Sequence, residues 1–348
     1  MLSRTLLLSL VILTPALVAQ EMGAPPPAKE LAKLQPLVGE WEGSGKVQAE
    51  PGADMTPWTA KSTYEWGFGK HWLMEHTKIS MEGMPTLEFH SATGWDREGK
   101  RFISIMGSNM GSVHKQEVDF VGDDKMLSVS SMVEGGKRIV ETGVTLIGKD
   151  GFTFKTHRTV DGGEPQFFLE GSFKRTKGLK LTPTDASFPV PTKIPELQRL
   201  SGMQGNYKVT GKMIPAPGME AMPISGKQSV MLVSGGTLMI FKVDGDPLPG
   251  SDFRYQSMGA LAWDKKRNCY RFGFVSNMGE GGVIDGFYDE KTRRIVFTRA
   301  GTMMGKPYVV REVMQLDDKG SIKSSATDAM HGSAKPSRDF EAKFEKIQ

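Results

Sequence analysis

Two copies of one sequence pattern follow each other in this chain, and this duplication restricts the folds open to it. A set of residues in the first copy recurs 166 positions later: Leu31, Leu34, Gly39, Trp41, Gly45 and Lys46 correspond to Leu197, Leu200, Gly205, Tyr207, Gly211 and Lys212. After a two-residue insertion, Ser108-Asn109-Met110-Gly111 matches Ser276-Asn277-Met278-Gly279. Solenoid repeats are only ~20–50 residues long. Each copy must therefore bury a hydrophobic core of its own.

The two copies and their flanks divide the chain into four parts. Residues 1–20 combine a positive Arg4 with an apolar run and small residues at the end, which is typical of a cleaved signal peptide. The run is shorter than the ~20 residues that span a bilayer. We expect a first domain at 28–176, a proline-containing linker at 177–193 and a second domain at 194–348. The mature protein is expected to be periplasmic or secreted, without a membrane anchor.

Short segments of alternating polar and apolar residues, separated by glycine-containing turns, fill both copies after a short helix at 28–35. The first copy has ten such segments, near 41–49, 59–68, 70–80, 87–95, 101–110, 113–121, 125–133, 137–147, 150–159 and 165–175. Regularly spaced short strands predict an all-β sandwich or barrel. Consecutive antiparallel strands favour a closed up-and-down barrel, because closure removes the exposed sheet edges. We therefore expect two tandem antiparallel barrels of about ten strands each, large enough to enclose a small ligand.

The composition excludes several classes of function. The 44 basic and 40 acidic residues give a net charge of +4 and are interspersed along the chain. They form no basic block of the kind that nucleic-acid binders carry. Cys269 is the only cysteine, so an intramolecular disulfide is excluded. The motifs of zinc proteases, serine hydrolases, P-loop proteins and dinucleotide-binding enzymes are absent, and we assign no catalytic residue.

Each copy begins its first strand with an aromatic residue that can close one end of a barrel. Trp41 lies in a glycine-x-tryptophan motif, and its expected partner is a cation from the last strand, either Lys174 or Arg175. Such a cation–π contact contributes ~0.5–2 kcal/mol. The second copy has Tyr207 at this position, with Lys346 as the corresponding cation.

Several segments give the chain a resemblance to a known family. They are Leu37 to Lys46, Gly69-Lys70-His71-Trp72-Leu73, Gly94-Trp95-Asp96, Ser108 to Gly111 and Phe173-Lys174-Arg175-Thr176. Together they resemble the bacterial domain-of-unknown-function family 1579, over nearly the whole first copy and more distantly in the second. The family is similar to calycin and lipocalin barrels. The resemblance thus implies two tandem lipocalin-like barrels, and it implies no catalytic residue.

The working function is the binding of a small, largely apolar ligand. Alternate residues of a strand share one face, so Phe102, Ser104, Met106 and Ser108 lie together and match Tyr270 to Ser276 of the second copy. The expected ligand-binding residues are Trp66, Trp72, Phe102, Met106 and Asn109 in the first copy and Tyr255, Phe272, Phe274 and Asn277 in the second. The two asparagines could instead cap strand ends through their own backbone.

Two other classes of function remain open at this point. A lumen enzyme of the cyclase or isomerase type would use a buried ionisable group, for which His71, Glu75 and His114 are the candidates. A purely structural or interaction module would have packed barrels. We expect no cofactor and no metal, because His71 and His76 are five residues apart and face opposite sides of a strand. Haem held by a lumen histidine, as in nitrobindin-type barrels, is the alternative.

Of the two copies, the first is expected to hold the ligand. It retains more of the family pattern, and it carries five of the six histidines. The second copy would then mainly stabilise the first.

Overall fold

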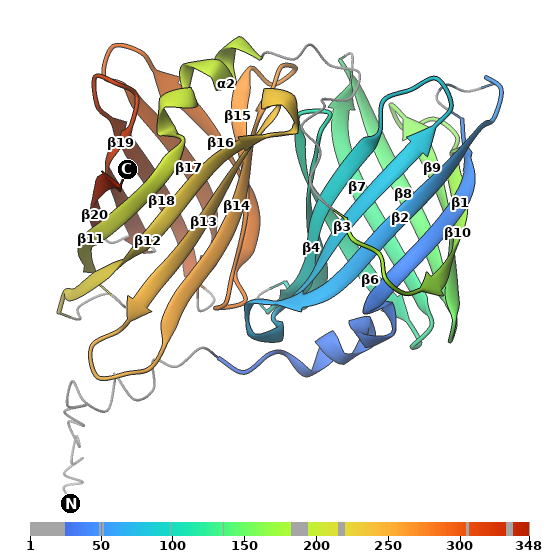
Figure 1. Ribbon diagram of the computed structural model, residues 1–348, viewed down its shortest axis with the longest axis horizontal. Coiled ribbons are helices and arrows are strands. Elements are labelled where there is room, and N and C mark those ends of the chain that lie inside the picture. Colours follow the sequence, from blue (N-terminus) through green and yellow to red (C-terminus); the bar gives the residue numbers. More distant parts are fainter. Residues whose placement is uncertain are drawn as a thin grey trace, which may run out of the picture.

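The computed structural model confirms two closed ten-stranded antiparallel barrels (Figure 1). It describes residues 25–347 except for 49, 51, 98, 135, 182–193, 215–219, 304–305 and 332–336. The signal peptide expected at 1–20 and most of the linker expected at 177–193 lie outside the described residues. Among the described helices, none is long and apolar enough to cross a membrane.

The first barrel follows the up-and-down order expected from the sequence. Its strands are β1 (Gly39–Val47), β2 (Thr56–Gly67), β3 (Trp72–Met81), β4 (Leu87–Asp96), β5 (Arg101–Ser108), β6 (Ser112–Val121), β7 (Lys125–Glu134), β8 (Lys137–Ile147), β9 (Gly151–Val160) and β10 (Gln166–Thr176). Strand β1 pairs with both β2 and β10, which closes the barrel.

The second barrel repeats this topology. Its strands are β11 (Gly205–Met213), β12 (Met222–Val233), β13 (Leu238–Pro247), β14 (Arg254–Asp264), β15 (Cys269–Ser276), β16 (Gly281–Asp289), β17 (Arg294–Met303), β18 (Lys306–Leu316), β19 (Ile322–His331) and β20 (Ser337–Ile347). Short helices precede the first strand of each barrel and join some strands: η1 (Lys29–Leu37), η2 (Phe68–Lys70), α2 (Pro195–Arg199), η3 (Ser201–Met203) and η4 (Ser234–Gly236).

One end of the first barrel is closed by η1 and Trp41. The indole is fully buried and donates a hydrogen bond from Nε1 to the Leu37 carbonyl at 2.8 Å. Arg175, one of the two expected cations, lies with its guanidinium carbon 4.2 Å from the ring centroid. Its nitrogens donate to the carbonyls of Val38 and Pro36, so the last strand is tied to the end of η1.

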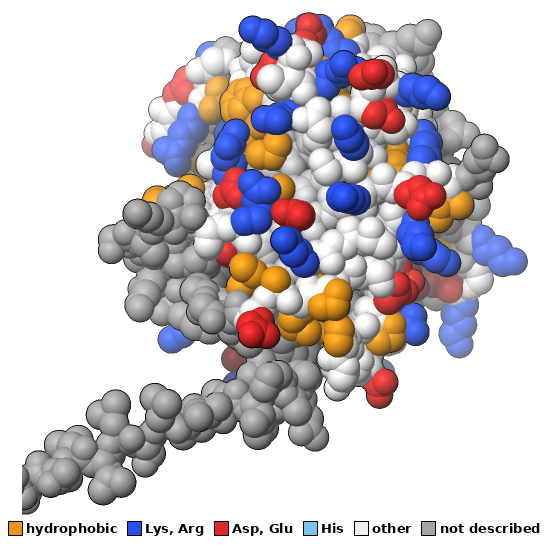
Figure 2. Space-filling model, turned by 90° about the vertical axis from the view of Figure 1, so that its left-hand side faces the viewer, with side chains coloured by type: hydrophobic (Ala, Val, Ile, Leu, Met, Phe, Trp, Pro, Cys, Tyr) orange, Lys and Arg blue, Asp and Glu red, His pale blue; other side chains and the backbone are white. Residues whose placement is uncertain are grey.

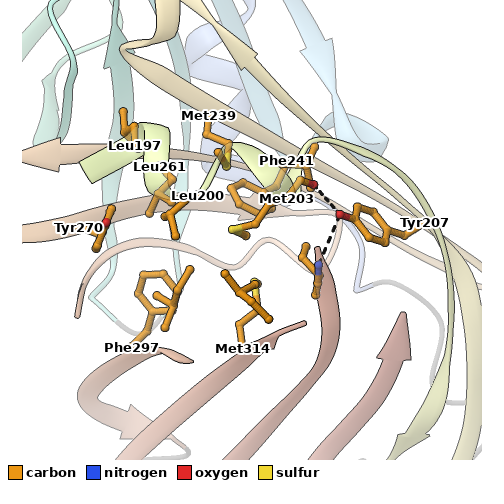
Figure 3. Packing of buried hydrophobic residues seen from close by; sticks show 14 of the residues in the cluster. Leu197, Leu200, Met203, Tyr207, Met239, Phe241, Leu261, Tyr270, Phe297 and Met314 are labelled. Carbon is orange, nitrogen blue, oxygen red and sulfur yellow. Dashed lines mark hydrogen bonds between the residues drawn. The ribbon is translucent and has the colours of Figure 1, made fainter. Parts of the chain in front are cut away.

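The second barrel is closed by α2 and η3 in the same manner (Figure 3). The hydroxyl of Tyr207 donates to the Met203 carbonyl at 2.7 Å, and Leu197 and Leu200 are fully buried beneath the helices. The Lys346 ammonium lies 5.9 Å from the Tyr207 ring centroid. Figure 1 shows the closing helices at opposite ends of the molecule, so the two barrels point in opposite directions.

The barrels pack back to back through outer faces that are apolar. Strands β5 and β6 contact β14, β15 and β16. Apolar side chains from both barrels are buried between them, including Ile103, Ile105, Val113, Leu238 and Val275. A Cβ at Gly273 would lie 2.7 Å from Ile105 and Val113, so this close approach requires glycine.

Trp72 lies in this interface, which corrects the expectation that it lines the first lumen. Its ring is fully buried, and Nε1 donates to the Ser276 carbonyl of the second barrel at 2.9 Å. A Cβ at Gly281 would lie 2.4 Å from the ring, so the second barrel makes room for the indole. Trp72 pairs with Gly94 across β3 and β4, on the outer face of the sheet.

The Ser-Asn-Met-Gly segments of both copies also lie at the interface. Thr237 donates to the Asn109 carbonyl at 3.2 Å, and a Cβ at Gly111 would contact Thr237 at 3.5 Å. A Cβ at the corresponding Gly279 would lie 3.0 Å from His71, the first-copy equivalent of Thr237. Both glycines have positive φ, near 75°, which favours glycine. The repeated motif therefore shapes a turn through which each barrel contacts the other.

The outer face farthest from the first barrel carries charges of both signs (Figure 2). Several of them pair: Arg293 with Asp318, and Arg338 with Asp328. The interspersed charges of the sequence thus include neighbouring ion pairs, one between the turns that flank β17 and β18 and one between β19 and β20.

Candidate functional site

A cavity of about 810 Å³ lies inside the second barrel. Its lining is mainly aromatic and aliphatic, and includes Phe241, Leu261, Phe272, Phe274, Ile284 and Phe297. Pro25, where the described chain begins, also lines it. The volume falls in the ~300–1,000 Å³ range of small-molecule sites, which are typically apolar with a few polar groups.

Three of the expected binding residues line this cavity: Tyr255, Phe272 and Phe274. Phe272 and Phe274 stack with ring centroids 6.2 Å apart, and both point inward from β15. A Cβ at Gly259 would lie 2.3 Å from the Phe272 ring, so the glycine on β14 lets this ring lie flat against the wall. Burial raises the pKa of Tyr255 to about 12, and its hydroxyl stays protonated at neutral pH.

Polar and charged groups interrupt the apolar wall at several positions. The Gln228 amide nitrogen is buried and has no hydrogen-bond partner among the residues that the structure describes, and the residue is only 8% exposed. Glu312 and Arg299 face the cavity from β18 and β17. Burial raises the pKa of Glu312, and the positive charge of Arg299 opposes this rise. Arg299 also lies 5.4 Å from the Phe274 ring centroid.

Aromatic side chains pack against one another inside the first barrel. Trp58 stacks on Phe154 with centroids 5.9 Å apart and lies 6.0 Å from Phe173. Phe173 also stacks on Phe152 at 4.7 Å. These residues belong to the buried core of this barrel.

The strand registers show where the second barrel, which holds the cavity, has smaller inward side chains than the first. The equivalent inward positions can be read from matching strand pairs, such as Gly45 with Trp58 and Gly211 with Ile224. Large aromatic residues of the first barrel are smaller in the second: Trp58, Phe89 and Phe154 correspond to Ile224, Ser257 and Ser325. All three replacements line the cavity.

The middle of the first lumen is polar instead. Glu75 accepts hydrogen bonds from Thr77 at 2.7 Å and from Ser91 at 2.6 Å. The Ser62 hydroxyl lies 2.6 Å from that of Thr77 and shares a hydrogen bond with it. Burial, and then the charge of Glu75, raises the pKa of Tyr64 well above its ordinary value. The carboxylate that the enzyme alternative invoked is thus held by hydroxyl groups.

His114, another candidate of the enzyme alternative, faces Met106 across β5 and β6. Burial, and then the positive charge of Arg271, lowers its pKa to about 4. The unfolded chain therefore binds this proton more readily, near pH 6.5. Stability is full above about pH 6.5 and falls as the pH drops toward 4, by about 3 kcal/mol for this group.

A His114→Gln variant tests this, because it removes the titrating group. We expect the variant to lose less stability than the wild type between pH 7 and pH 4, by about 3 kcal/mol. Urea unfolding at a series of pH values gives both curves. Parallel curves would show that His114 is not a buried neutral histidine.

Two expected binding residues lie at the closed end of the first barrel. Trp66 donates from Nε1 to Gln35 of η1 at 2.9 Å. Phe102 is buried and packs edge-on against Trp95 and Phe120, with centroids 4.9 and 5.1 Å away. These two residues thus form part of the core that closes the barrel beneath η1, away from the cavity. Met106 lies on the inner face of β5.

Asn109 and Asn277 use their amides to hold neighbouring strands. Asn109 accepts a hydrogen bond from the Glu88 backbone at 2.9 Å and donates to the Thr86 carbonyl at 2.9 Å. Asn277 accepts from the backbone of Gln256 and donates to the Arg254 carbonyl. Both amides bind strand backbone, which corrects the expectation that they orient a ligand.

The sequence did not predict one cluster of histidine and glutamate side chains. His76 and His90 face each other across β3 and β4, and Glu88 lies beside them. The spacing of histidines along one strand does not reveal this pair, which depends on the register between two strands. An expected hairpin joining the segments 70–80 and 87–95 was the signal that could have brought them together.

Comparison with known proteins settles the family. The model of the family described as "Protein of unknown function (DUF1579)" matches residues 26–175 and 192–344. This chain belongs to the DUF1579 family. The DUF1579 pattern thus occurs twice, as the resemblance implied. A search of curated proteins finds no match.

Solved structures similar to this DUF1579 protein are remote in sequence. Rv2717c from M. tuberculosis is 16% identical, with a TM-score of 0.35 over 43% of this chain and 99% of its own. A protein of unknown function from the DUF3598 family of Nostoc punctiforme is 9% identical, with a TM-score of 0.28 over 92% and 100%. The vaccine antigen transferrin binding protein B from Haemophilus parasuis is 9% identical, with a TM-score of 0.18 over 89% and 76%.

Proposed function

We propose that this protein binds a small, amphipathic and largely apolar ligand in the second barrel. The observation that carries the proposal is the cavity of about 810 Å³ with its aromatic and aliphatic lining. Burial of apolar ligand surface against such a wall contributes roughly 25 cal/mol per Å² removed from water. This proposal moves the ligand from the first copy, where we expected it, to the second.

The polar groups indicate that the ligand is amphipathic. An unpaired buried donor costs ~1–3 kcal/mol, so the Gln228 amide favours a ligand that brings a hydrogen-bond acceptor. Glu312 and Arg299 offer a second polar position on the opposite strands. A carbonyl, ether or hydroxyl oxygen on an apolar body satisfies this lining.

The two lumens differ in their side chains, which supports different roles for the two barrels. The first barrel fills its lumen with Trp58 and Phe154 and holds Glu75 with hydroxyl groups. We therefore propose that the first barrel supports the second through the shared interface. The signal peptide pattern at 1–20 further supports a role outside the cytoplasm, and the intact mass of the mature chain tests that part.

A pair of substitutions that restores first-barrel residues tests the proposal. Ser257→Phe combined with Ser325→Phe introduces the side chains that the first barrel has at these positions, Phe89 and Phe154. We expect the double variant to lose the binding of N-phenyl-1-naphthylamine, a neutral apolar dye whose fluorescence rises in apolar sites. The reason is that both new rings occupy the cavity.

The matched control is Ser324→Phe, which places the same ring one residue away on the outer face of β19. It should bind the dye as the wild type does. Circular dichroism and thermal melts check that all variants are folded. Wild-type fluorescence that stays at the level of free dye, or equal binding by the folded double variant, would refute binding in this cavity.

A further inference from the structure

Three side chains of metal-ligating types meet on the outer wall of the first barrel. His76 on β3 is directly opposite His90 on β4, and Glu88 precedes His90 by two residues, so all three share one face. Their donor atoms lie within 4.8 Å of one another. The imidazole rings stack with centroids 4.4 Å apart.

The carboxylate is the fixed member of this cluster. Glu88 Oε1 lies 2.5 Å from His76 Nε2 and 3.5 Å from His90 Nε2. The Glu88 side chain is fully buried, whereas that of His90 is 32% exposed. An ion from solvent can therefore reach a buried carboxylate past His90. Burial of a charged carboxylate is costly unless cations or hydrogen-bond donors compensate for it.

The backbone beneath the cluster is anchored on both sides. The Glu88 N–H donates to Asn109 Oδ1 at 2.9 Å, and the Asn109 N–H donates to the Glu88 carbonyl at 3.0 Å. Thr237 of the second barrel donates to the Asn109 carbonyl. The inter-barrel contact thus holds the strand that carries two of the three donors.

The fold itself does not require these donors. The second barrel forms the same hairpin. Asn277 exchanges hydrogen bonds with the backbone of Gln256, as Asn109 does with the backbone of Glu88. Its register puts Lys242 and Met258 at the positions of His76 and His90. The same backbone arrangement therefore forms without a His-Glu-His set.

We propose that His76, Glu88 and His90 bind one divalent transition-metal ion, for which Zn²⁺ is the natural fit. Two imidazole nitrogens and one carboxylate oxygen, with a fourth position open to water, are a common donor set for Zn²⁺. Ligand distances of ~2.0–2.2 Å require the stacked rings to rotate toward a shared point. Imidazole nitrogens and carboxylates bind a metal ion only in their deprotonated forms, so binding weakens in acid. This site is independent of the second-barrel cavity.

A neighbouring cation gives the proposal a specific electrostatic consequence. Lys78 is directly opposite Glu88 in the register and faces the same side of the sheet. Its ammonium repels a metal ion bound at the carboxylate, by an amount that depends on solvent screening. Lys78→Met should therefore strengthen metal binding, a gain that a purely structural His-Glu contact does not produce.

The experiment is a Zn²⁺ titration of the full chain after treatment with a chelator, followed by calorimetry or by competition with a chromogenic chelator. We expect one site per chain in the wild type. His90→Ala and the near-isosteric Glu88→Gln should lose it, and the control His157→Ala should keep it. Co²⁺ bound at the same site should show visible d–d bands that disappear in His90→Ala.

Circular dichroism shows whether a variant that has lost the site is still folded. Glu88→Gln also preserves the shape of the side chain, which His90→Ala does not. Tighter binding by Lys78→Met and weaker binding at acidic pH complete the expected result. Absence of Zn²⁺ uptake by the folded wild type would overturn the proposal. So would a site that His157→Ala removes as well as His90→Ala does, since that is adventitious binding by surface histidines.

Discussion

Trp41→Ala is expected to lower the free energy of unfolding of the first barrel by about 3–5 kcal/mol, the range for truncation of a buried aromatic residue. The indole is fully buried, donates to the Leu37 carbonyl and packs edge-on against Phe152 with centroids 5.0 Å apart. It also forms the platform under Arg175, which ties β10 to η1. Its removal leaves a cavity at the closed end and unpairs a buried carbonyl.

Urea unfolding followed by circular dichroism measures this loss. The control is Leu146→Ala, because Leu146 is 52% exposed on the same barrel and its truncation should change stability by at most ~0.5 kcal/mol. If Trp41→Ala and Leu146→Ala destabilise the chain equally, Trp41 does not close the barrel.

Trp72→Ala is expected to separate the two barrels after cleavage of the linker at 177–193. In the wild type, the nicked halves should stay together, because apolar outer faces and the bond from Trp72 to Ser276 join them. Loss of the fully buried indole should weaken this association by about 3 kcal/mol or more, which is roughly a hundredfold.

Limited proteolysis followed by gel filtration gives the result directly. Nicked wild type and a nicked Phe287→Ala control, which truncates an exposed aromatic residue on β16, should elute at the size of the whole chain. Nicked Trp72→Ala should elute as two halves. Separation of the nicked wild type would show that the interface is weak.

Much of the fold follows from the repeat and the alternation of residues. Strand periodicity correctly placed Phe272 and Phe274 on one inner face of β15. The glycine-x-tryptophan motif correctly predicted that Trp41 contacts a cation of the last strand. Both inferences use short-range patterns, which a strand preserves when it enters a barrel.

The facing of Trp72 and the His76–His90 pair could not be derived in this way. Phe68, Gly69 and Lys70 all have positive φ, so the chain makes an irregular turn between β2 and β3, and this turn sets which side Trp72 faces. The histidine pair depends on the register of β3 against β4. A one-residue shift in either place exchanges inner and outer faces.

The cavity can be located only by comparing the volumes of side chains that face each other across neighbouring strands. Ser257 stands where the first barrel has Phe89, and this difference is visible in the sequence only once the registers are known. The number of histidines favoured the first copy, but His76 and His90 lie on the outer wall of that barrel, and aromatic residues pack inside it. The smaller residues of the second copy leave the space.

Native mass spectrometry of the protein purified from its own host tests the central claim most directly, with the wild type and the Ser257→Phe, Ser325→Phe double variant prepared side by side. We predict that the wild type carries a retained ligand of defined mass, that Ser324→Phe carries the same ligand, and that the double variant has lost it. A ligand that stays bound to the folded double variant would contradict binding in the second barrel.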